Sequence, residues 1–410
     1  MFTRTGDSGE PGSLLPRACR QRCVTLTTTA LSIREIIADR AIRAVFQPVV
    51  DLHTGDIVAV EALARGPEGT DLESPGRLFA AAEAAGVTRQ LDWACRAAAA
   101  EAALEAGLPR QIRLFLNAEP RSLMTPCPDE HLDLFRAAVD QLSLVVEVTE
   151  RDLGAHPAGL IAALTQMRAM GLGVAIDDVG VDPMSLAFLP FVEPDVIKLD
   201  MSLVQDPMNR RIAALAAAIG ADAERRGAIV LAEGIETDEH LERATILGAS
   251  LGQGWLLGRP ATLTELAPRL QLRTGERRPR LELLRSGLGP LQPTPWDLVA
   301  DCPRRRTTTK SLLMPMSRHI EQSAMWSPDT VLLGTFQHRR FYTPATEQRY
   351  RDLAAACGFV GAIAVGLVPC ADESVRFADL PEQHPLVSQW CVVVVGPHQA
   401  SALIAREAGA

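Results

Sequence analysis

The sequence lacks long hydrophobic runs: none of its apolar stretches reaches the roughly 18 residues that a membrane-spanning helix needs. Membrane insertion is therefore not expected. Positive charge is also in short supply, since 41 Lys and Arg residues stand against 50 Asp and Glu residues and give a formal net charge of −9. This balance argues against an extended DNA-binding surface, which needs a basic face. A compact anionic ligand could still bind through metal ions.

The sequence has no zinc-binding pattern of cysteines and no recognisable secretion signal. Its eight cysteines are scattered, and the close pair Cys19 and Cys23 has no second pair at zinc spacing. The first 30 residues are interrupted by Pro and Gly and contain no apolar core of a signal peptide. Residues 1–30 are therefore expected to be a disordered leader. Reduced thiols and a cytoplasmic location are expected for the folded part.

From Val45 onward the chain alternates short β-rich runs with helical patterns. The runs are AVFQPVV, DIVAVEAL, IRLFLNA, LSLVVEVTE, LGVAIDDV, DVIKLD, AIVLAEG and GQGWLL. This alternation predicts a TIM-like (β/α) barrel over residues 31–271, with a large doubly wound sheet as the other possibility. The first two runs are joined only by His53–Asp56, which is too short for a crossover helix, so their strands are expected to pair antiparallel.

The composition changes after Leu272, where Arg, Gly and Pro dominate and no strand pattern persists. Residues 272–291 are therefore predicted to be a linker. A second series of elements follows, with strand-like VLLGTFQH, helical EQRYRDLAAACG and strand-like FVGAIAVGLV. Residues 292–410 are predicted to form a smaller C-terminal α/β domain.

Each predicted barrel strand ends in a polar residue. Alternate side chains of a strand share one face, so Glu61 continues the apolar face of Ile57 and Ala59. Active sites of barrels collect where strands end, which predicts one polar cluster. Its members are Glu61, Asn117, Glu147, Asp177, Asp178 and Glu233, with Lys198 nearby.

This cluster holds more carboxylates than can stay ionised at close range without a countercharge. Hard divalent cations with oxygen ligands supply that charge best, so a pair of Mg²⁺ or Mn²⁺ ions is predicted. The strand ends carry neither His nor Cys, which argues against a zinc site of the usual type.

The same segments, in order, resemble the EAL family of cyclic di-GMP phosphodiesterases, which is named for the tripeptide Glu61-Ala62-Leu63. The resemblance covers about residues 33–268, through the motifs FQPVVDLHTGDIVAVEALAR, FLNAEP, VVEVTE, AIDDVG, VIKLD, AEGIE and GQGW. It implies hydrolysis of cyclic di-GMP to linear 5′-pGpG by a two-metal mechanism. It further implies that Glu61, Asn117, Glu147 and Asp177 hold one ion, and that Asp177, Asp178 and Glu233 hold the other.

The resemblance also assigns supporting roles. Catalytic roles fall to Lys198, Glu233 and Glu236, and substrate contacts to Gln47, Leu63, Arg65, Asp200 and Gln253. Glu150 matches the glutamate that anchors the loop following Asp178.

That loop departs from the family pattern. Val179 replaces an aromatic residue, and Asp182-Pro183 replaces Gly-Tyr, where proline restricts both its own backbone and that of the preceding residue. In the family the loop supports metal binding and dimer contacts, so a homodimer through the barrel is possible here. The alternative to a hydrolase is a receptor that binds cyclic di-GMP without cleaving it and acts through protein partners.

The C-terminal segment, with GTFQHRRFYTPATEQRYRDLAAACGFVGAIAVG, resembles the DICT domain, a sensory module found with cyclic di-GMP enzymes. This resemblance implies that the C-terminal domain regulates the barrel in response to a signal or partner that the sequence does not identify.

Overall fold

The computed structural model describes residues 31–149, 157–180, 183–270, 294–303, 305–326, 328–368 and 374–407, with backbone alone for residues 158 and 183–185. The predicted leader and linker, as well as Glu150, Val181 and Asp182, lie outside these residues. No helix within the described ranges combines the length and the hydrophobicity that crossing a membrane requires.

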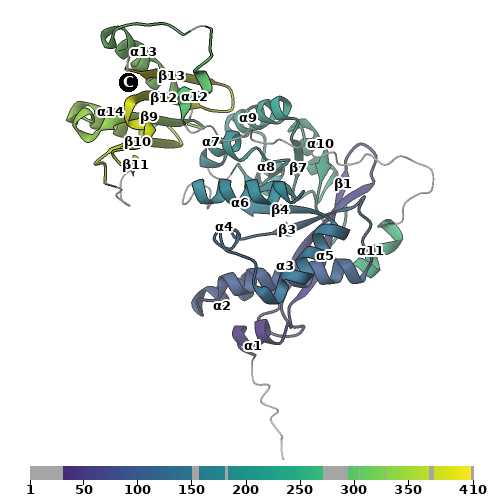
Figure 1. Cartoon of the computed structure of the whole chain (residues 1–410). Coiled ribbons are helices and arrows are strands. Elements are labelled where there is room, and N and C mark those ends of the chain that lie inside the picture. Colours follow the sequence, from purple (N-terminus) through teal and green to yellow (C-terminus); the bar gives the residue numbers. More distant parts are fainter. Residues whose placement is uncertain are drawn as a thin grey trace, which may run out of the picture.

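The first part of the chain forms a closed barrel whose strands follow the order β1 to β8 (Figure 1). The strands are β1 Arg43–Asp51, β2 Ile57–Arg65, β3 Arg113–Asn117, β4 Ser143–Thr149, β5 Gly173–Val179, β6 Val196–Leu199, β7 Ile229–Ala232 and β8 Leu251–Gly252. Strand β1 pairs antiparallel with both β2 and β8, whereas the other neighbours are parallel. The predicted barrel with one antiparallel strand is confirmed.

Helices cover the outside of the barrel. They are α1 Ile33–Ala38, α2 Pro75–Ala84, α3 Thr88–Glu105, α4 Pro120–Leu123, α5 Leu132–Gln141, α6 Pro157–Ala169, α7 Pro183–Val192, α8 Met201–Gln205, α9 Arg210–Arg226, α10 Asp238–Ile246 and α11 Leu263–Leu270. Local signals set their ends: Ser32 and Glu35 form a capping box at α1, and Gly227 ends α9 at φ +72°.

The eighth strand is shorter than the sequence suggested. Of the segment GQGWLL only Gly252 lies in β8, and the residues after it form turns. Gly254 has φ +157°, and a Cβ there would lie 2.1 Å from the backbone oxygen of Ile235. The backbones of the two segments approach so closely that the chain turns instead of extending.

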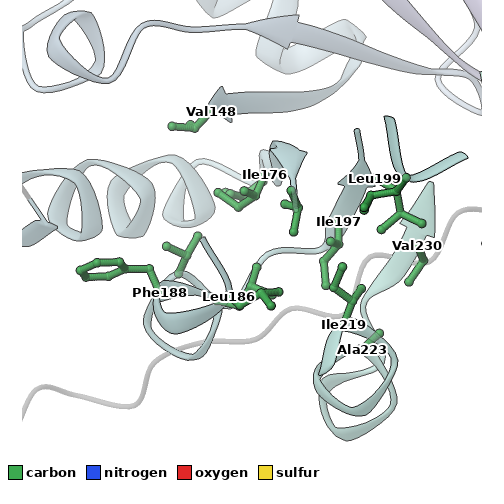
Figure 2. Close-up of a cluster of buried hydrophobic side chains, with 14 of the residues drawn as sticks. Val148, Ile176, Leu186, Phe188, Ile197, Leu199, Ile219, Ala223 and Val230 are labelled. Carbon is green, nitrogen blue, oxygen red and sulfur yellow. The ribbon is translucent and has the colours of Figure 1, made fainter. Parts of the chain in front are cut away.

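Two apolar layers hold the barrel together. Inside it, Val49, Ala59, Phe115, Val145, Ala175, Val196, Leu231 and Leu251 pack on one another. Outside it, side chains of the strands pack against the helices, as Figure 2 shows for Ile176 and Ile197 beside Leu186 of α7 and Ile219 of α9. The inner layer fills the barrel, so polar side chains are left for its rim.

The C-terminal domain is a five-stranded sheet in the order β11-β10-β9-β12-β13. Its strands are β9 Val331–His338, β10 Phe359–Val365, β11 Arg376–Asp379, β12 Gln389–Val395 and β13 Ala400–Arg406, and its helices are α12 Pro295–Val299, α13 Lys310–Ala324 and α14 Pro344–Ala354. The strands β9, β10 and β11 are parallel, and β12 and β13 are antiparallel additions. The predicted smaller α/β domain is confirmed.

Candidate metal centre

The inner layer of the barrel fixes where the polar side chains lie. In each parallel strand the site residue stands two positions after a member of that layer, so both point to the same side of the sheet. The pairs are Ala59 and Glu61, Phe115 and Asn117, Val145 and Glu147, Ala175 and Asp177, Val196 and Lys198, and Leu231 and Glu233. Gln47 precedes Val49 by two positions because β1 runs antiparallel, and Gln253 follows Leu251. The polar side chains therefore form a second layer above the apolar one.

Lys198 lies at the centre of this polar layer and is 1% exposed. Its Nζ lies 2.8 Å from Glu233 Oε1, 3.0 Å from Glu147 Oε1 and 3.0 Å from Asp177 Oδ1. A fourth carboxylate oxygen, Glu61 Oε2, lies 3.4 Å away. One ammonium group thus joins carboxylates of the strands β2, β4 and β5 and of the residue that follows β7.

Amide side chains complete the surroundings of Glu61. Asn117 Nδ2 donates a hydrogen bond of 2.8 Å to Glu61 Oε1, and Gln253 Nε2 donates one of 2.6 Å to Oε2. The same Gln253 nitrogen also lies 3.0 Å from Gln47 Oε1, while Gln47 Nε2 donates to the carbonyl of Gly258 at 3.1 Å. These contacts link the first and last strands of the barrel across the site.

The carboxylates carry more negative charge than Lys198 balances. Burial raises the pKa of Glu147 well above its ordinary value, and the neighbouring Glu61 adds to the rise. Burial raises the pKa of Glu233 to about 8, although Lys198 opposes the change. Burial also acts to raise the pKa of Glu61, but Lys198 and the bond from Gln253 outweigh it and leave that pKa lowered. The site therefore favours additional positive charge.

The donor set fits divalent cations that prefer oxygen. Carboxylate oxygens of Asp177, Asp178 and Glu233 lie within 4.8 Å of one another, close enough to share one ion. The buried Oε2 of Glu147 accepts no hydrogen bond within the described part of the chain, so it is available as a ligand. Oxygen ligands without sulfur or imidazole suit Mg²⁺, Ca²⁺ or Mn²⁺. Asp178 has φ +58°, a backbone strain of the kind that often marks functional sites.

The structure places the remaining predicted residues at the ends of strands and helices or at exposed positions. Asp200 is the N-cap of α8, and its carboxylate accepts a bond of 2.9 Å from the Ser202 amide. Glu236 is exposed, and its amide donates to His240 Nδ1 at 3.3 Å. Leu63 and Arg65 lie at the half-buried end of β2, where Arg65 Nη1 donates to the carbonyl of Ala64 at 2.8 Å.

One supporting pair was not singled out from the sequence. Asp92 and Arg96 in α3 are both buried, and their side chains form an ion pair of 2.6 Å. The other oxygen of Asp92 accepts a bond of 3.1 Å from the Glu119 amide, which fixes the turn after Asn117. An acidic residue four positions before a basic one within an alanine-rich helix was the available signal.

Comparison with known families assigns both domains. Residues 30–260, more than half of the chain, match the EAL domain. The chain belongs to the EAL-domain family. Residues 298–408, beyond this EAL domain, match DICT, described as a "Sensory domain in DIguanylate Cyclases and Two-component system". Both resemblances inferred from the sequence are confirmed.

Relatives of the EAL domain include two proteins of Pseudomonas aeruginosa that are named cyclic di-GMP phosphodiesterases. NbdA is 32% identical over 243 residues, which cover 57% of this chain and 31% of NbdA. RocR is 31% identical over 223 residues, which cover 53% of this chain and 57% of RocR. The chain therefore spans between about a third and somewhat more than half of these relatives' length.

A solved structure of the EAL enzyme Bd1971, in a form with cAMP and cyclic di-GMP bound, superposes with a TM-score of 0.51 at 23% identity. The superposition covers 58% of this chain and 67% of that one. At this level of identity the match supports the fold.

Proposed function

We propose that the barrel is a phosphodiesterase that hydrolyses cyclic di-GMP to linear 5′-pGpG with two divalent cations, Mg²⁺ or Mn²⁺. The observation that carries the proposal is the polar layer, in which oxygens of four carboxylates lie 2.8 to 3.4 Å from the ammonium nitrogen of Lys198. The names of NbdA and RocR point to the same substrate.

The reaction opens one of the two phosphodiesters of the ring. The oxygen of a water molecule forms a bond to one phosphorus, the bond from that phosphorus to the 3′ oxygen breaks, and the 3′ oxygen leaves with a proton. Bound divalent cations would activate the water and neutralise charge on the phosphoryl oxygens.

The chain's own residues divide into three groups in this proposal. Glu61, Asn117, Glu147 and Asp177 hold one cation, and Asp177, Asp178 and Glu233 hold the second. Lys198, which is buried among four carboxylates, balances negative charge that builds up on the reacting phosphate. Glu233 and Glu236 assist proton transfer. Gln47, Leu63, Arg65, Asp200 and Gln253 contact the substrate, and Glu150 anchors the loop after Asp178.

A receptor that binds cyclic di-GMP without cleaving it is the second candidate. The observation in its favour is Val179, which is fully buried at the end of β5 where the family pattern has an aromatic residue. The complete set of oxygen ligands favours the hydrolase, because a receptor has no need of it.

We further propose a cytoplasmic location, in which the buried thiols of Cys357 and Cys391 stay reduced. A homodimer through the barrel, and a signal or partner acting on the C-terminal domain, remain parts of the same proposal.

The test incubates the purified full chain with cyclic di-GMP and either Mg²⁺ or Mn²⁺, and resolves the products by chromatography. The expected product is pGpG, which should disappear when EDTA removes the cations. Glu61→Ala should abolish the reaction, whereas Glu68→Ala, at a side chain that is 83% exposed, should leave it unchanged. Binding without pGpG would support the receptor instead, and turnover that survives Glu61→Ala would show that the site is misassigned.

A further inference from the structure

Helix α7 differs from an ordinary outer helix of a barrel, which presents a polar face to water. Its described side chains, at residues 186–192, are LAFLPFV, nearly two helical turns without a polar group. Leu186 and Leu189 are fully buried and account for the side that faces the barrel. A helix that is apolar all round needs a cover on its outer side as well.

The C-terminal domain supplies part of that cover. The ring of Phe359, the first residue of β10, meets the ring of Phe188 edge to face, with centroids 5.3 Å apart and planes at 75°. Phe188 is only 5% exposed, and Phe359 packs against the apolar cluster of the barrel. In Figure 2 the Phe188 side chain points away from Leu186 and Ile197, and Figure 1 shows the C-terminal domain on the α7 side of the barrel.

Phe359 is placed for this contact by its own sheet. The next residue, Val360, is 1% exposed and belongs to the core of the C-terminal domain. Because neighbouring side chains of a strand point to opposite faces, Phe359 is directed out of that core. Its position is held by pairing with Val331 of β9 and by a bond of 3.2 Å from its amide to the Thr330 carbonyl.

The contact lies close in sequence to the candidate metal centre. Strand β5 carries Asp177 and Asp178, and α7 begins at Pro183, so Phe188 stands ten positions after Asp178. Arg211 of α9 donates a bond of 3.1 Å to the carbonyl of Gly180 and so holds the segment that leaves β5. Because α7 begins four positions after β5 ends, a restraint on α7 limits the movement of the strand end that carries Asp177 and Asp178.

We propose that the C-terminal domain docks on α7 through Phe359, and that this docking stabilises the positions of Asp177 and Asp178 at the end of β5. The docking itself is independent of any reaction, while its effect on the site rests on the proposed function. Beyond the burial of its apolar area, an aromatic pair of this geometry contributes enough free energy to change an equilibrium about two- to twelvefold. The effect of docking on metal affinity cannot exceed the whole interaction free energy of the docking, because a coupled equilibrium shifts only by the difference in interaction energy.

The docking is tested by hydrogen exchange of the α7 amides at residues 186–189, 191 and 192 in the full chain, since Pro190 has no amide hydrogen. Phe359→Ala should speed their exchange about two- to twelvefold. The matched control is Phe341→Ala, in the same domain at a ring that is 37% exposed and contacts Lys310 and Arg340. Should Phe359→Ala unfold its domain, Phe359→Leu replaces it, since leucine keeps apolar volume and removes the ring edge.

Unchanged α7 exchange in a folded Phe359 variant, or the same increase in Phe341→Ala, would overturn the docking. If protection of the α7 amides from exchange depended on protein concentration and not on Phe359, a second copy of the chain would cover α7. That result would overturn the proposed docking as well. The exchange measurements need no substrate, so their result is independent of the hydrolysis assay.

The effect on the site is tested with Mn²⁺ alone, whose binding to the full chain is followed by electron paramagnetic resonance. Phe359→Ala should weaken Mn²⁺ binding about two- to twelvefold, while Phe341→Ala leaves it unchanged. Equal Mn²⁺ affinity in the wild type and in Phe359→Ala would refute the coupling even where docking is verified.

Discussion

Replacing Lys198 by methionine should destabilise the metal-free barrel strongly. Methionine approximates the volume of the lysine stem and removes the charge that lies 2.8 to 3.4 Å from four carboxylate oxygens. At an effective dielectric constant of about 20, each such contact has a gross attraction of about 5 kcal/mol. Burial of the ammonium offsets much of this sum, and removing one partner of a buried ion pair costs about 3–5 kcal/mol.

For a domain of this size that loss corresponds to a fall of about 6–20 °C in the midpoint of thermal unfolding. The measurement is calorimetry of the wild type and of Lys198→Met, each in EDTA and in excess Mg²⁺. Divalent cations bound to the same carboxylates replace the missing charge, so the difference in midpoint should narrow in Mg²⁺. Lys310→Met, at an exposed position on α13, is the control; it removes only an exposed cation–π contact with Phe341 and should change stability by about 1 kcal/mol or less.

Two results would refute this reasoning. A Lys198→Met chain as stable as the wild type in EDTA would show that the carboxylates are neutralised in another way. An equal loss in EDTA and in Mg²⁺ would show that Lys198 serves packing alone and that the cations bind elsewhere.

Three further predictions concern the packing of the two domains. Gly254→Ala should lower the free energy of unfolding, measured by urea denaturation, by more than about 1 kcal/mol, because its Cβ would lie 2.1 Å from the Ile235 oxygen. Gly76→Ala in α2 is the control: its Cβ has open space, and the substitution should raise the free energy of unfolding by up to about 1 kcal/mol. Asp92→Asn leaves the buried Arg96 without an anionic partner and should lower the free energy of unfolding by about 3–5 kcal/mol in the same measurement. A change of less than about 0.5 kcal/mol would contradict a stabilising role of this ion pair. Burial raises the pKa of Cys357 to about 11, so at pH 8 only about one Cys357 thiol in a thousand is ionised. A maleimide should therefore label exposed Cys302 before Cys357, and fast labelling of Cys357 in the folded chain would be inconsistent with its burial.

The sequence predicts the barrel well because two simple periodicities govern it. Alternation along strands places Glu61, Glu147 and Asp177 on the inner face, and the order of strands brings their ends together. Both inferences need only the local pattern, and the closed barrel bears out the fold. The roles of the individual side chains still await the assays above.

Other features depend on contacts between distant segments, which a local pattern does not contain. The short β8 follows from the close approach of Gly254 to Ile235. Asp200 caps helix α8, and this role competes with its predicted contact to substrate. The residue type is suited to both roles, so the sequence alone does not distinguish them. The alanine-containing segment at 400–406 is β13 because the edge of β12 offers it a complete register of partners.

The two-residue strand β8 also determines when the site can form during folding. It closes the barrel by pairing Val50 with Gly252 and Asp51 with Leu251, residues separated by most of the domain. Contacts of such long range form late, because a long loop must be closed before they contribute. Gln47 and Gln253 flank this closure and both contact the layer around Glu61. During synthesis the polar layer therefore stays incomplete until nearly the whole barrel has left the ribosome, because a chain that ends before Gln253 lacks the amide that binds Glu61.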